Sequence, residues 1–299
     1  MSAGRPRMNL ANALGLLAAP LAAAPAAAQA VEPLLLMNPT TGWSVDYAED
    51  SCVLRRSFGS GEGTALLELR QGGPGDSYEL TLGSDTLASA RRTPRVYHGT
   101  DTDWYEPARP SLLSSGNWHA VRFNDSLRPA ALKPKDEAWP VWPNEDRDAR
   151  ETAVDQITIT GGFERDLTLR TGRMHAPMDA LRVCTRELVT RWGLDPDVQD
   201  TLSRRVTPIQ QAGWTRQMLN AYPLDMLRKG KSGRVAIRLL VDVNGKPTQC
   251  VATKGMAEPS FETAACSGAM RYARFEPALD AGGQPVASYW LTTILYSIP

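Results

Sequence analysis

The chain has 299 residues, which is enough for two ordinary domains that each bury a core. Its 33 basic and 33 acidic residues give a formal net charge of zero. This balance argues against a nucleic-acid-binding protein, because such proteins carry a dense basic patch.

The first 30 residues have the pattern of a secretory signal peptide. Two arginines precede an apolar run over residues 10–21, and Ala-Gln-Ala at residues 28–30 offers a small-residue cleavage site. The alternative, a retained inner-membrane anchor, needs about 20 apolar residues, whereas Pro20 and Pro25 interrupt this run. We therefore expect an exported mature chain that begins at Val31 and has no stable membrane span.

Residues 31–202 predict a β-rich domain of unknown function that is closed by one helix. Glycine-rich turns separate short runs with strand character. The expected strands are Trp43–Tyr47, Cys52–Phe58, Ala65–Arg70, Tyr78–Leu82, Trp118–Phe123, Gln156–Thr160 and Leu167–Arg170. The helix is expected from Pro177 to Trp192, with Leu181, Cys184 and Leu188 on one face.

Between Pro94 and Pro143, the density of prolines favours loops or short edge strands over central strands. Trp104, Trp139 and Trp142 lie here, and they either line a recognition surface or hold long loops on the sheet. The mixed charges of residues 145–148 indicate a solvated turn or a helix end. Residues 195–212 are short and polar, as in a connector between two domains.

Residues 203–299 predict a small α/β domain. The segment from Arg234 to Val243 alternates apolar and polar side chains, which is typical of a half-buried strand. Asn244-Gly245 is a strong hairpin signal, and Pro247–Thr253 is the expected partner strand. A helix is expected from Pro259, and a long final strand from Val286 to Ile298.

Four cysteines in an exported chain predict two disulfides, with three ways to pair them. Cys250 and Cys266 lie on neighbouring elements of the same small domain, so we expect them to pair. Cys52 and Cys184 then remain, and their disulfide would join the start of the first domain to its end.

The sequence offers no motif for catalysis, a cofactor or a metal. His98, His119 and His175 are spread over different elements without the spacing of metal ligands, and Cys-x-x-Cys is absent. Residues 225–232 fail the phosphate-loop pattern because Asp225 stands where its first glycine is required. A Gly-x-Ser-x-Gly elbow is also missing. We therefore expect a protein that is not an enzyme.

The order and spacing of several short motifs resemble the C-terminal domain of TonB, the energy transducer of outer-membrane transport in Gram-negative bacteria. These motifs are Tyr222-Pro223, Ser232-Gly233, Asp242-Val243-Asn244-Gly245, Phe275-Glu276-Pro277-Ala278, Asp280 and Gly283. The resemblance covers residues 217–299 and implies a helix, a β-hairpin, a second helix and a long final strand. Together with the first domain, it places the chain in the α+β class.

The resemblance implies a periplasmic protein whose partner, such as a TonB-dependent outer-membrane receptor, adds a short strand to the final strand of the domain. The expected partner-binding residues are Tyr222, Pro223, Tyr289, Trp290, Leu291, Thr292 and Tyr296. Asn220-Ala221 departs from the family pattern before Tyr222-Pro223. An open final strand would also allow a homodimer.

Energy transduction is a stronger claim than partner binding, because TonB draws on the proton gradient through a membrane helix. This chain is expected to lose its hydrophobic segment on export, so it could bind a partner without pulling on it. Two alternatives remain open. One is a secreted ligand-binding protein that docks through the TonB-like domain, and the other is an exported hydrolase with an unrecognised site.

Overall fold

The computed structural model describes residues 1, 4, 34–60, 63–88, 92–108, 110–130, 144–253 and 257–298. The expected signal peptide, apart from Met1 and Gly4, lies outside the described residues. The chain divides into two units, Met1–Glu32 and Pro33–Pro299. Within the described residues, no helix has both the length and the hydropathy that a membrane crossing requires.

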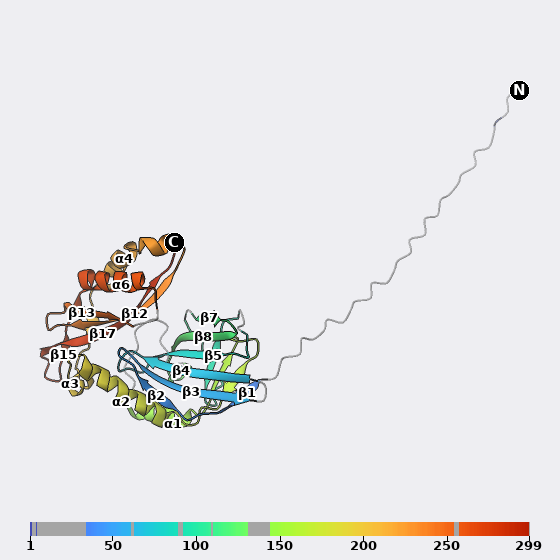
Figure 1. The fold of residues 1–299 in the computed structure, drawn as a ribbon, viewed down its shortest axis with the longest axis horizontal. Helices are drawn as coiled ribbons and strands as arrows, with labels where there is room; N and C mark the ends of the chain where they lie inside the picture. Colours follow the sequence, from blue (N-terminus) through green and yellow to red (C-terminus); the bar gives the residue numbers. More distant parts are fainter. Residues whose placement is uncertain are drawn as a thin grey trace. The chain divides into compact units, whose positions relative to one another are not determined.

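A ten-stranded sheet dominates the first part of the second unit (Figure 1). Nine strands follow the order β6-β9-β10-β1-β3-β4-β5-β8-β7, and β2 pairs with β3. The strands are β1 (Leu35–Pro39), β2 (Ser44–Tyr47), β3 (Cys52–Ser60), β4 (Gly63–Gln71), β5 (Tyr78–Ser84), β6 (Arg95–His98), β7 (Ser111–Ser115), β8 (Trp118–Asp125), β9 (Ile157–Thr160) and β10 (Leu167–Leu169). All seven strands expected from the sequence are present.

Helix α2 (His175–Arg191) closes this sheet as the apolar spacing predicts. Leu181, Cys184 and Leu188 are fully buried in a core to which β1, β3–β5, β8 and β10 also contribute. Cys184 forms a disulfide with Cys52 of β3. The helix face and the disulfide thus hold the same side of α2 on the sheet.

The proline-rich segment contributes β6 and β7, which are the two ends of the strand order. The sequence predicts such short edge segments without placing them. Trp104 is 41% exposed and lies under the Arg95 guanidinium, 4.1 Å from ring centroid to Cζ. Trp139 and Trp142 lie outside the described residues. The mixed charge run at residues 145–148 begins a complete helix, α1 (Asn144–Ala153), rather than a turn.

The second part of the unit is a three-stranded antiparallel sheet with helices on one face. The order is β13-β12-β17, and α6 packs on β12 and β13 (Figure 1). The elements are α3 (Pro196–Asp200), β11 (Thr207–Pro208), α4 (Gln211–Asn220), α5 (Leu224–Arg228), β12 (Gly233–Val241), β13 (Pro247–Ala252), α6 (Pro259–Tyr272), β14 (Phe275–Glu276), β15 (Ala278–Leu279), β16 (Pro285–Val286) and β17 (Ser288–Tyr296).

Two details differ from the sequence prediction. The connector at residues 195–212 is not plain linker, because it contains α3 and β11 and the start of α4. The expected final strand is interrupted at Ala287, so that Val286 ends the short strand β16 and β17 begins at Ser288. The hairpin, the following helix and the final strand otherwise lie where the sequence places them.

Aromatic rings and a second disulfide hold this smaller core together. Phe261 of α6 stacks on Tyr296 of β17 with 5.1 Å between ring centroids, and Tyr222 meets both rings edge-on. Cys250 of β13 forms a disulfide with Cys266 of α6. The buried residues of this cluster are separate from those under α2. The two cores agree with two domains, and the boundary expected at residue 202 stays a prediction.

Candidate functional site

Strand β17 is an edge strand. It pairs with β12 along its whole length, from Ser288 opposite Val241 to Tyr296 opposite Gly233. No other strand pairs with β17 in the part of the chain that the structure describes. The second side of its backbone is therefore available to an additional strand.

The ladder decides which backbone groups face the open side. Alternate residues of an antiparallel strand direct their N–H and C=O groups toward the same neighbour. Thr253 N donates to Ala236 O at 2.9 Å, so the odd-numbered residues of β12 face β17. Ile237 lies opposite Thr292, so the even-numbered residues of β17 bond to β12. The residues whose N–H and C=O groups point to the open edge are Tyr289, Leu291, Thr293 and Leu295.

The open edge has a defined beginning. Gln199 of α3 is buried, and its Nε2 donates to Ala287 O at 3.0 Å. Ser288 Oγ in turn donates to Oε1 of Gln199 at 2.6 Å. Ala287 has the same outward parity as Tyr289, so this amide closes the edge just before β17. From Tyr289 to Leu295, no hydrogen bond links an outward backbone group to another described residue.

A groove of about 480 Å³ runs along the open edge. Helix α4 provides one wall through Gln211, Trp214, Thr215 and Leu219. Strand β17 provides the other through Trp290, Thr292, Thr293, Ile294 and Leu295. Trp214 fixes the position of α4, because its ring lies 5.7 Å from that of Trp290 and its Nε1 donates to Ile209 O at 3.0 Å. The lining of the groove mixes apolar side chains with side chains that carry hydroxyl groups.

A second cleft, of about 510 Å³, lies on the opposite face of the same strand. Its lining includes Leu291 and Arg238 of the small sheet and the glycine-rich turn at residues 72–75 of the β-rich region. The two hollows share four lining residues, so they adjoin the same part of β17. These shared residues are Gln211, Trp290, Thr292 and Thr293.

The structure separates the expected partner-binding residues into two groups. Trp290 and Thr292 line the groove, and Leu291 is 36% exposed beside it. Tyr289 is half-buried, with its ring 5.0 Å from that of Trp192.

Tyr222, Pro223 and Tyr296 lie elsewhere. Tyr296 is 1% exposed, and burial raises its pKa to about 12, so its side chain belongs to the core and is not offered to a partner. Tyr222 packs on Phe261 and donates to Lys231 O at 2.5 Å. Pro223 precedes α5. The α4 wall was missed because its contact with β17 joins segments about 75 residues apart, although Trp214 was a visible aromatic signal.

The comparison with protein families adds an independent finding. Residues 219–298 match the family described as Gram-negative bacterial TonB protein C-terminal. This segment is a TonB C-terminal domain. The match begins within α4 and ends after β17, so the TonB C-terminal domain contains the open edge and part of the α4 wall. No curated protein matches the chain.

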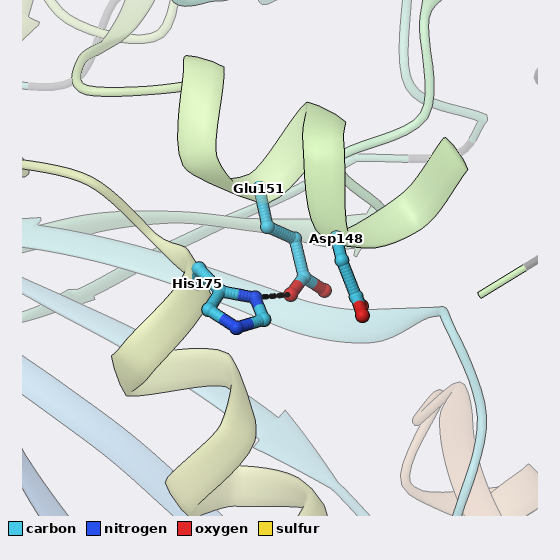
Figure 2. Close-up of side chains that lie close together, drawn as sticks. All are labelled: Asp148, Glu151 and His175. Carbon is cyan, nitrogen blue, oxygen red and sulfur yellow. Dashed lines mark ion pairs between the residues drawn. The ribbon is translucent and has the colours of Figure 1, made fainter. Parts of the chain in front are cut away.

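A cluster outside the TonB C-terminal domain has the composition of a metal site. Asp148 and Glu151 of α1 and His175 at the start of α2 each place a ligand atom within 4.8 Å of the others, as Figure 2 shows. No sequence motif indicated this cluster, because His175 is 24 residues away from Glu151. Its surroundings decide whether it is free to take an ion.

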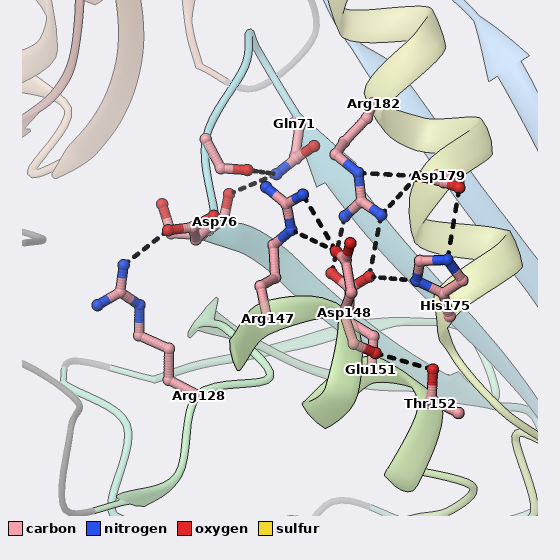
Figure 3. A network of polar contacts seen from close by, with 12 residues as sticks. Gln71, Asp76, Arg128, Arg147, Asp148, Glu151, Thr152, His175, Asp179 and Arg182 are labelled. Carbon is pink, nitrogen blue, oxygen red and sulfur yellow. Dashed lines mark hydrogen bonds and ion pairs between the residues drawn. The ribbon is translucent and has the colours of Figure 1, made fainter. Parts of the chain in front are cut away.

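Two arginines already neutralise these carboxylates (Figure 3). Arg182 donates to both oxygens of the buried Glu151 at 2.8 and 3.0 Å, and Arg147 donates to Asp148 at 3.1 and 3.2 Å. The hydrogen bond from Arg182 also lowers the pKa of Asp179. We interpret this network as an ionic link between α1 and α2 rather than a metal centre.

His98 is also part of a buried polar group. Its Nε2 lies 3.0 Å from Oδ2 of Asp125, and the exposed fractions of the two side chains are 2% and 0%. Tyr78 Oη approaches the same carboxylate at 3.5 Å, and burial followed by the charge of Asp125 raises the pKa of this tyrosine well above its ordinary value. These contacts join the three side chains in one buried polar group inside the β-rich core.

Proposed function

We propose that this chain is an exported periplasmic interaction protein that binds an extended segment of a partner by β-strand addition at the open edge of β17. The observation that carries this proposal is the edge itself: four residues of β17 direct their backbone groups away from β12, and two of them, Thr293 and Leu295, line the groove walled by α4. Backbone hydrogen bonds to an added strand would supply affinity, and the groove would select its side chains.

The TonB C-terminal domain supports the choice of partner. Domains of this family bind outer-membrane receptors in general, so a receptor segment is the leading candidate. A role in TonB-type transport follows from the same family assignment and belongs to the proposal. We also propose that the chain is not an enzyme; in support, Arg182 pairs with Glu151, and His98 and Asp125 are buried together among the described residues.

Proline substitutions test the edge without removing its side-chain walls. Thr293→Pro removes an outward N–H while leaving the β12 ladder intact, because Thr293 has outward parity. Ala252→Pro is the matched control, since Ala252 has the same outward parity on β13, the opposite edge of the sheet. Both variants should retain wild-type circular dichroism.

The assay is affinity capture of periplasmic and outer-membrane proteins by the immobilised mature chain. Wild type and Ala252→Pro should retain the same partner, and Thr293→Pro should lose it. Equal retention by folded Thr293→Pro protein would refute docking at β17. Sedimentation of the purified chain tests self-pairing: a dimer that Thr293→Pro converts to a monomer would make a second copy, and not a receptor, the occupant of the edge.

A further inference from the structure

The β-rich region is fixed against the outer face of β17. Trp192, at the end of α2, lies edge-on to Tyr289 with 5.0 Å between ring centroids, and the Arg238 guanidinium lies 4.4 Å above the Trp192 ring. Gly73 is so close to this surface that an added Cβ would lie 2.9 Å from both Leu291 and Trp192. These contacts bring the turn at residues 72–75 beside the docking edge.

A strand added at the open edge would have two differently walled faces. Successive side chains of a strand point to opposite faces of the sheet. One set would enter the groove with Trp214, Thr215 and Leu219 of α4. The other set would enter the cleft formed by Leu291 of β17 and the turn at residues 72–75.

The charges of the second wall are unequally paired. Glu79 lies 3.5 Å from Arg122 and is neutralised by it. Arg70 and Arg238 also line the cleft, and neither forms an ion pair with a described residue. Arg238 Nε is buried without a hydrogen bond. Among the described residues of this lining, Asp50 is the one remaining acid, so two guanidinium groups face one carboxylate there.

We propose that the β-rich region forms the second wall of the docking cleft and selects the partner, an extended peptide with apolar side chains toward α4 and an acidic side chain toward Arg70 and Arg238. This inference rests on the proposed function and extends it, because it assigns a task to a region outside the family match. Gln199 fixes one end of the bound strand by occupying Ala287 O, so the guest pairs only from Tyr289 onward.

The test uses the immobilised mature chain and a display library of short random peptides. Wild-type protein should enrich peptides in which every second residue is apolar, as required on the side that faces α4. Among the residues between them, which face the second wall, one should be acidic. Arg70→Glu should change that preference from an acidic to a basic side chain. It should also weaken the binding of the peptides selected by the wild-type protein about fivefold, as expected for the loss of a partly exposed ion pair. Leu219→Lys should alter only the preference for apolar residues at the peptide positions that face α4.

Arg228→Glu is the matched control, because it makes the same charge change on an exposed residue of α5 outside both hollows. It should leave both preferences unchanged. If Arg70→Glu also leaves them unchanged while Thr293→Pro abolishes retention, the second wall is refuted and edge docking stands. If no peptide is enriched, or if enrichment survives Thr293→Pro, edge docking fails and the inference fails with it.

Discussion

Two turns of the TonB C-terminal domain form a matched pair for measuring how much one close backbone contact contributes. In the first turn, Asp242 Oδ1 accepts hydrogen bonds from the N–H groups of residues 244 and 246, and Gly245 N donates to Asp242 O. Asp280 and Gly283 repeat the same bonds in the second turn. Gly245 and Gly283 have φ angles of 75° and 78°.

Only one of these glycines is enclosed. A Cβ added to Gly283 meets nothing within 4 Å, whereas a Cβ added to Gly245 would lie 1.8 Å from Phe275 O. Gly283→Ala should therefore cost about 1 kcal/mol, which is the strain of a left-handed alanine. Gly245→Ala adds the displacement of the turn from Phe275, whose N–H donates to Gly245 O at 3.0 Å.

Phe275 is 2% exposed, so its N–H would lose its partner in a buried setting. That loss costs about 1–3 kcal/mol, and we expect Gly245→Ala to cost about 3 kcal/mol in all. Urea unfolding of both variants measures the difference in the free energy of unfolding, with unchanged m-values as the check on two-state behaviour. Equal losses for the two alanines would refute the steric argument and leave backbone strain as the whole effect.

Two further predictions concern the covalent and ionisable groups of the core. Removing the Cys52–Cys184 disulfide, which closes a span of 132 residues, should lower the free energy of unfolding by about 5 kcal/mol. Removing Cys250–Cys266, which closes a span of 16 residues, should lower it by about 3 kcal/mol. Chemical unfolding of the paired Cys→Ala variants measures both losses, and a larger loss for the shorter span would contradict the loop-entropy argument. The raised pKa of Tyr296 leaves stability unaffected below pH 10.0 and lowers it by about 3 kcal/mol as pH rises through about 12. Tyr296→Phe should remove this alkaline loss, and an unaltered pH profile would show that the phenol is not responsible.

The sequence by itself determined most strands and the long helix of the β-rich region, and it determined the hairpin, the following helix, the final strand and the family of the second region. Period-two alternation from Arg234, the Asn244-Gly245 turn and the helix at Pro259 depend on local geometry, and local geometry is readable from neighbouring residues. The pairing of Cys52 with Cys184 followed by elimination, once Cys250 and Cys266 were paired within one small domain, and the apolar face of the helix indicated that Cys184 faces the core.

The sequence missed elements that local pattern does not specify. Helix α1 is strongly polar, and Glu151 is its one buried residue, so it has no apolar stripe from which the helix could be predicted. Strands β6 and β7 are short and lie at the ends of the sheet, where pairing on one side is enough to hold them. Strand β6 pairs with β9, which lies about 60 residues further along the chain, so no local pattern specifies it. Strand β7 pairs with β8 across the short turn at Gly116-Asn117, which was not predicted from the sequence as a hairpin.

Tertiary structure alone decided the character of the docking edge. Tyr296 and Trp290 are both aromatic residues of the final strand with the same parity, yet Phe261 buries the first and the groove beside α4 exposes part of the second. Which N–H groups face outward depends on the register against β12, and which charges face a guest depends on the packing of Trp192 and Gly73. Register and packing are relations between distant segments, so no window of sequence contains them.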